Sequence, residues 1–199
     1  MGKTEYVEDT TIQGRKEEIA IKVDRIKKLL ESQKLEALYL TRQSNFAWLT
    51  AGSSNVVTIC TEDGVASLLV TKNGRKFAIT TVNEEPRMKE EQHLEELGFE
   101  VISQAWYENR NEEIVKKIVG SLDHIGADVQ FGTAKMIKGL IDPLRYSLTH
   151  NEICRYQYLG DHMSEALENY LARVKPGMTE YEIAGGVAAA LWPYQIDQV

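Results

Sequence analysis

The chain has 199 residues, of which 43% are hydrophobic and 27% are charged, as is typical of a soluble globular protein. Its formal net charge of −7 argues against nucleic acid as a partner, which would need clustered lysine and arginine. The sequence has no apolar run long enough to span a membrane, no secretion signal and no CxxC motif, so we expect a cytoplasmic protein with reduced cysteines.

Three regions follow one another along the chain. Residues 1–14 are polar and charged, and we expect them to form a loose leader. Residues 15–147 alternate helix-like and strand-like stretches, which predicts one α/β domain of comfortable size. Residues 148–199 have a helical pattern only, and we expect two helices there.

The α/β region opens with a predicted helix and a short strand. Apolar residues recur at helical spacing from Ile19 to Leu30, which gives the helix one apolar face. The apolar segment LEALYL (35–40) follows as a strand. The next segment, SNFAWLTAGSSN (44–55), is rich in Ser, Asn and Gly, so we expect loop at least at its ends.

A three-stranded meander is predicted next, from strands at 56–60, 65–71 and 76–82. The pair Asn73–Gly74 lies between the last two strands and signals a tight hairpin, because both residues tolerate a positive φ.

The remainder of the α/β region alternates helices with strands. An acidic helix is expected from Pro86 to Gly98, followed by a strand at 99–103, a helix within 111–122 and a last strand within 124–132. The meander and the helix-separated strands together predict a mixed β-sheet with helices on both faces.

The two helices expected after residue 148 carry start signals of the same kind. Thr149 with Glu152, and Thr179 with Glu182, form capping boxes that satisfy free N–H groups at a helix start. Pro176 and the glycine after it end the first helix. Both helices have apolar stripes, so we expect each to need a partner surface.

Several stretches resemble the creatinase, prolidase and aminopeptidase P family. SNFAWLTAG is similar to an Asn-aromatic-Leu-Thr-Gly stretch of that family, although Ala51 stands where glycine is usual. The hairpin with its Arg/Glu-rich helix, and the pair LRYSLTHNEICRYQYLGDHMSEAL and KPGMTEYEIA, follow in the family's order and spacing. The resemblance covers residues 20–192.

The resemblance implies a creatinase-like N-terminal domain of ribonuclease H-like topology, followed by the first two helices of an incomplete "pita-bread" catalytic domain. It implies a metal-dependent Xaa-Pro peptidase whose two divalent ions (Mn, Co or Zn) bind two aspartates, a histidine and two glutamates from a later sheet. None of those positions lies within residues 1–199, so we expect no cofactor, no metal ligand and no catalytic residue in this chain.

The resemblance implies an accessory and dimerisation region. This region is not catalytically competent by itself. A peptide substrate would bind only to the intact parent protein, which includes the catalytic domain. The alternative is a stand-alone interaction module or a pseudoenzyme fragment. By resemblance the partner is a second copy of the chain. The candidate interface residues are Asn45, Phe46, Trp48, Ser53 and Asn55, because aromatic groups suit such surfaces. For Trp48 the alternative, which we favour, is that it fills the core of the α/β domain.

Two sets of mainly acidic residues are candidate metal-binding or catalytic sites within the chain. Asp161, His162 and Glu165 lie close together on a predicted helix and could share a metal ion, but we interpret them as a solvated helix face. Three other aspartates could suggest a nuclease-like cluster, which the acidic charge of the chain disfavours; these are Asp63, Asp123 and Asp128.

Overall fold

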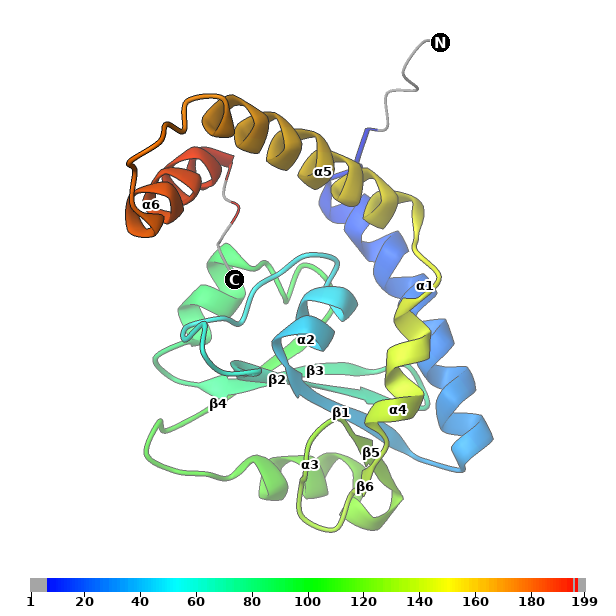
Figure 1. Cartoon of the computed structure of the whole chain (residues 1–199). Coiled ribbons are helices and arrows are strands. Elements are labelled where there is room, and N and C mark those ends of the chain that lie inside the picture. The colour runs from blue at the N-terminus through cyan, green and yellow to red at the C-terminus, as the bar shows by residue number, and fades with distance from the viewer. Residues whose placement is uncertain (1–6, 195, 197–199) are drawn as a thin grey trace. The chain divides into compact units, whose positions relative to one another are not determined.

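The computed structural model describes residues 7–194 and 196, and the chain divides into two compact units. One unit comprises Asp9–Ser147, and the other combines Met1–Glu8 with Leu148–Val199 (Figure 1). Among the described residues, no helix has the length and apolar character that crossing a lipid bilayer requires.

The unit of residues 9–147 is built on a six-stranded sheet with the strand order β4-β3-β2-β1-β5-β6. Its centre is an antiparallel meander of β1 (Ala37–Arg42), β2 (Asp63–Thr71) and β3 (Lys76–Thr81). The predicted hairpin between β2 and β3 is confirmed, and Gly74 has the positive φ of +82° that its turn requires.

The meander differs from the sequence prediction in its first strand. Residues 56–60 form an irregular segment, so the strand predicted there is wrong. β-Branched residues favour a strand only where they pack on a half-buried sheet, and Ile59 is instead exposed to solvent. β1 takes the place beside β2, with Leu38 opposite Val70.

Three further strands run parallel to their neighbours and make the sheet mixed. β4 (Glu100–Gln104) pairs with β3 at one edge. β5 (Ile125–Ala127) pairs with β1, and β6 (Lys135–Met136) pairs with β5 at the other edge. The predicted mixed sheet is therefore confirmed, although the two-residue β6 carried no clear sequence signal.

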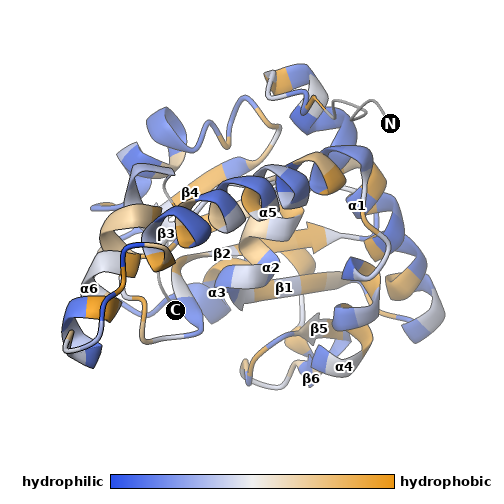
Figure 2. Ribbon diagram, turned by 45° about the horizontal axis from the view of Figure 1, so that its top comes forward, coloured by the Kyte–Doolittle hydropathy of each residue, from blue (hydrophilic) through white to orange (hydrophobic). Residues whose placement is uncertain are grey.

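One face of the sheet is covered by α1 (Ile12–Gln33) and α2 (Gln43–Leu49). Because strand side chains alternate, Leu38 and Leu40 of β1 point into this core. Figure 2 shows apolar residues concentrated on the strands beneath these helices. α1 begins at Ile12, within the segment expected as a loose leader, and residues 1–6 of that segment lie outside the described residues.

The opposite face of the sheet is covered by α3 (Asn111–Val119), and helices therefore flank both faces as predicted. Tyr39 of β1 points into this second core, where its ring stacks on Phe131 with 4.0 Å between the ring centres. Burial raises the pKa of the Tyr39 hydroxyl, which donates to Ser67 at 2.8 Å.

Short helical turns connect the main elements. The acidic helix expected from Pro86 to Gly98 is reduced to a π-helical turn, η1 (Arg87–Glu91), followed by further turns. The others are the 3₁₀ turns η2 (Leu122–His124), η3 (Asp142–Arg145) and η4 (Trp192–Tyr194) and the helix α4 (Lys138–Ile141).

The other unit contains the two predicted C-terminal helices, α5 (His150–Leu171) and α6 (Glu180–Leu191). Both capping boxes are present, with the Thr149 and Thr179 side chains accepting from the third backbone N–H of their helices. Tyr170 donates its hydroxyl proton to the Glu182 carbonyl oxygen at 3.1 Å. A Cβ at Gly186 would lie 2.1 Å from the Tyr170 ring, so a larger residue at this position would displace the Tyr170 side chain.

Candidate functional site

The five candidate interface residues lie on α2 and the loop that follows it, and all five are buried. Asn45, Phe46, Trp48, Ser53 and Asn55 each expose no more than 7% of their surface. Phe46 and Trp48 belong to the core between α1 and the sheet. An interface role for these residues stays a prediction, while their observed contacts hold α2 and its loop in place.

The start of α2 is anchored by a buried carboxylate. Asp128, which follows β5, accepts hydrogen bonds from the backbone N–H groups of Thr41 and Arg42 at 2.9 and 3.1 Å. It also accepts from the Asn45 side chain at 2.8 Å, whose oxygen accepts from Arg145 at 3.1 Å. The carboxylate thus fixes the backbone of the two residues that precede α2 and, through Asn45, the first turn of the helix.

The end of α2 is anchored by a buried ion pair on α1. Lys22 and Glu18 form this pair, with side chains that are 0% and 2% exposed. The Lys22 ammonium donates to the Trp48 carbonyl oxygen at 2.5 Å and lies 5.6 Å from the centre of the Trp48 ring. A cation at the carboxyl end of a helix is favourable because the last carbonyl groups carry partial negative charge.

Sequence reasoning missed this pair, although it left a signal. Glu18 and Lys22 are four residues apart, and they lie on the same side of α1 as Ile19 and Ile26, which are buried. A charged pair within an apolar stripe is unusual, since burial of such groups requires that they be paired.

The loop after α2 is held by side chains from two other elements. Arg15 of α1 donates to the Thr50 carbonyl oxygen at 3.0 Å and to the Ser53 hydroxyl at 2.6 Å. Gln92, after η1, accepts from the Ser54 N–H at 2.7 Å. The serines after the loop glycine are therefore part of a structural network.

Two positions of this loop, Ala51 and Asn55, have conformations or contacts that restrict which residues fit there. Ala51 has φ = +55°, a backbone conformation that costs an alanine more than it would cost a glycine. Asn55 donates to the Ala66 carbonyl oxygen at 2.7 Å and accepts from the Val65 N–H at 3.0 Å. A Cβ at Gly64 would lie 1.9 Å from the Asn55 side chain, so the buried position of Asn55 requires glycine at position 64.

The two sets of acidic residues identified in the sequence do not form a metal centre in the part of the chain that the structure describes. Within residues 7–194 and 196, no three His, Cys, Asp or Glu side chains gather as a metal site would need. His162 donates its Nδ1 proton to the Tyr158 carbonyl oxygen at 2.8 Å, and its ring stacks on that of Tyr158. Of the three aspartates, Asp128 is buried as the α2 anchor and Asp63 is exposed at the start of β2.

These features define a class of protein: a mixed α/β sheet domain, with a helix anchored by buried polar groups, that leads into a pair of capped helices. The family model described as Creatinase/Prolidase N-terminal domain matches residues 22–150. The chain belongs to this family, and the resemblance expected from the sequence is confirmed. No curated protein matches the chain.

Solved structures of peptidases from several organisms have the same fold as this chain. The Xaa-Pro dipeptidase from Bacillus anthracis is 17% identical, with a TM-score of 0.64 over 88% of this chain and 49% of its own. Dipeptidase PepE from Mycobacterium ulcerans is 15% identical, with a TM-score of 0.65 over 89% and 50%. A prolidase from Thermococcus sibiricus is 18% identical, with a TM-score of 0.64 over 85% and 48%. The chain spans about half the length of these structures.

Proposed function

We propose that this chain is the N-terminal region of an Xaa-Pro peptidase and supports a catalytic part contributed by a further segment of the intact parent. Two observations support the proposal. The family match covers the sheet domain, and the similar structures named as Xaa-Pro dipeptidase or prolidase are about twice as long as this chain.

The observation that carries the proposal is the exposed apolar surface of α5 and α6. Both helices are started by complete capping boxes, which shows that their ends are well specified. Their long apolar side chains nevertheless remain in solvent, up to 92% exposed for Tyr181. These side chains include Tyr156, Leu159, Met163 and Leu171 of α5 and Tyr181 of α6. Surfaces of this kind mark sites of association, and we assign them to packing against the catalytic part.

The proposed chemistry is hydrolysis of an amide bond beside proline by two divalent ions, as in the family that the sequence resembles. The described residues of this chain provide no donor set for such a centre. We therefore assign the metal ligands and the peptide site to the further segment. The sheet domain then acts in positioning and in homodimer formation, in a cytoplasmic protein whose Cys60 and Cys154 are both free thiols.

A hydrolysis assay tests the first part of the proposal. The purified 199-residue chain, supplied with Mn²⁺, Co²⁺ or Zn²⁺, is expected to release no proline from an Xaa-Pro dipeptide above the metal-only blank. Metal-dependent turnover by this chain would overturn the assignment of the active site to another segment. Sequencing of the gene past the codon for Val199 then tests the second part, since a continuing frame should encode two aspartates, a histidine and two glutamates.

The second candidate function is a stand-alone self-association module, which the same exposed helices favour. Sedimentation velocity of the chain should show association that grows with concentration. Replacing Leu159 and Met163 by serine should reduce it, whereas Tyr107→Ser, at a more exposed apolar site on the sheet domain, should not. A stop codon directly after Val199 together with a stable dimer would favour this module over the peptidase region.

A further inference from the structure

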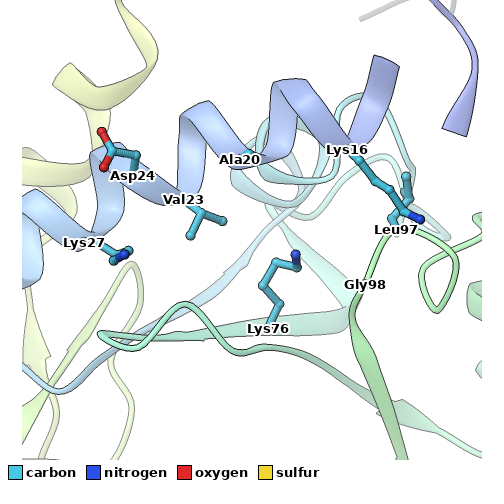
Figure 3. Close-up of a pocket in the computed structure, with 8 residues that line it drawn as sticks. All are labelled: Lys16, Ala20, Val23, Asp24, Lys27, Lys76, Leu97 and Gly98. Carbon is cyan, nitrogen blue, oxygen red and sulfur yellow. The ribbon is translucent and has the colours of Figure 1, made fainter. Parts of the chain in front are cut away.

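A groove with a volume of about 380 Å³ lies in the sheet domain between α1 and the start of β3 (Figure 3). One wall is a single face of α1, and the other is formed by Lys76 with the turn at Leu97 and Gly98. None of the interactions described for α2 and its loop uses these residues. The volume is within the range of sites that hold small molecules.

The α1 wall carries two lysines separated by apolar residues. Lys16, Ala20, Val23 and Lys27 follow one another at spacings of four, three and four, so they share one helix face. The helix covers about 16 Å between the two lysines at 1.5 Å per residue. Both side chains are long enough to reach toward the centre of the groove, over the apolar surface of Val23.

Lys76 faces this wall from the sheet side and is only partly exposed to solvent. Figure 3 shows its ammonium group directed toward α1. The group lies 5.5 Å from the centre of the Phe99 ring. Burial, with a further contribution from the charge of Lys16, lowers the pKa of Lys76 below its usual value. The positive charge of Lys16 is therefore close enough to disfavour the protonated form of Lys76.

Among the residues that the structure describes, no side-chain hydrogen bond or ion pair joins the ammonium group of Lys16, Lys27 or Lys76 to a carboxylate. Lys27 has a weaker electrostatic interaction with Asp24. The acidic residue of the lining, Asp24, is paired with Lys28 at 2.7 Å. In Figure 3 its carboxylate points away from Lys76, so it offsets the charge of Lys27 more than that of the other two lysines.

Gly98 keeps the groove open beside Lys76. It has φ = +85°, and a Cβ at this position would lie 3.2 Å from the Lys76 ammonium nitrogen. A larger residue would therefore press on the ammonium group and fill space next to it. Because glycine has no side chain, a ligand atom can approach close to the Lys76 ammonium group at this point.

We propose that this groove binds a small phosphorylated molecule, with its phosphate between Lys16 and Lys76 and its apolar part against Val23 and Leu97. Lysine binds phosphate as a point charge, so two ammonium groups on opposite walls of one groove suit a multiply charged anion better than they suit a single carboxylate. The groove is a small positively charged site in a chain whose net charge is −7. The negative charge of the rest of the chain repels polyanions such as nucleic acid. The assignment is independent of the peptidase proposal, because no metal or peptide contributes to it.

Isothermal titration of the 199-residue chain with inorganic pyrophosphate tests this site. Saturable binding at one site per chain is expected, and Lys16→Met and Lys76→Met should each weaken it by about tenfold or more, since a lost charge-assisted contact has that order of effect. Lys117→Met on α3 removes the same charge from the opposite face of the sheet and should leave binding within about twofold of the original.

Three results would overturn the proposal. The first is the absence of saturable pyrophosphate binding. The second is binding that Lys117→Met weakens as much as Lys16→Met does, which would show a diffuse charge effect only. The third is equal affinity for succinate, which would assign the groove to carboxylates. Lys16 is exposed, so its variant tests the site even if replacement of Lys76 disturbs folding.

Discussion

Replacement of Lys22 by methionine is the sharpest test of how α2 is held. The substitution keeps an unbranched side chain of similar length but removes the ammonium group. Glu18 then remains in a buried position without its lysine, and the Trp48 carbonyl oxygen loses a donor at 2.5 Å. Removal of one partner of a buried ion pair costs about 3–5 kcal/mol, so we expect the free energy of unfolding to fall by that amount.

The double variant Glu18→Leu/Lys22→Met shows whether the loss comes from burying the Glu18 carboxylate without Lys22. Replacement of both charges by apolar groups is close to neutral in many buried pairs. In the native structure the Trp48 carbonyl oxygen also accepts from the Ala51 N–H at 3.3 Å, and we expect this bond to remain in the double variant. We therefore expect the double variant to recover most of the stability lost by Lys22→Met, which is a strongly non-additive result.

A pair on the same helix provides the matched control. Lys28 and Asp24 have the same four-residue spacing, but their side chains are 75% and 58% exposed. Lys28→Met should change stability by less than about 0.5 kcal/mol. Urea unfolding followed by far-ultraviolet circular dichroism measures all of these variants. A loss below about 1 kcal/mol for Lys22→Met, or additive effects in the double variant, would refute the reasoning.

Three other substitutions probe separate parts of the fold. Asp128→Asn weakens the anchor at the start of α2 and should cost about 1–3 kcal/mol in urea unfolding, whereas Asp63→Asn at an exposed site should have little effect. Lys34 ends α1 with φ = 55°, so Lys34→Gly should raise the melting temperature by relief of about 0.5–1 kcal/mol of backbone strain; a lower melting temperature would contradict this. Gly186→Ala should destabilise the α5–α6 pair by about 1–3 kcal/mol, but Gly185→Ala, with open space around its Cβ, should not; equal effects on thermal unfolding would argue against the close packing seen here.

The elements that the sequence predicted well are those with strong local signals. α1, α5 and α6 have apolar residues at helical spacing, and the last two also have capping boxes. The hairpin between β2 and β3 is encoded by an Asn-Gly pair within four residues. In each case the information lies within one or two turns of the chain, so no knowledge of tertiary contacts is needed.

The elements that the sequence did not predict depend on distant partners. α2 consists of QSNFAWL, whose Ser and Asn favour turns, and it is helical because both of its ends are anchored by residues from other elements. Residues 56–60 have the composition of a strand but no neighbouring strand to pair with. The groove at Lys16 and Lys76 was equally hidden, because it joins the first helix to a strand sixty residues later.

The anchoring of α2 has a consequence for synthesis on the ribosome. A helix of seven residues is too short to be stable alone. Asn45 contacts Asp128 and Arg145, which lie 83 and 100 residues further along the chain. The β2–β3 hairpin can form as soon as its own residues emerge, but α2 lacks these anchors until nearly the whole sheet domain has been translated. The SNFAWLTAG segment is thus among the last parts of the domain to acquire its native structure.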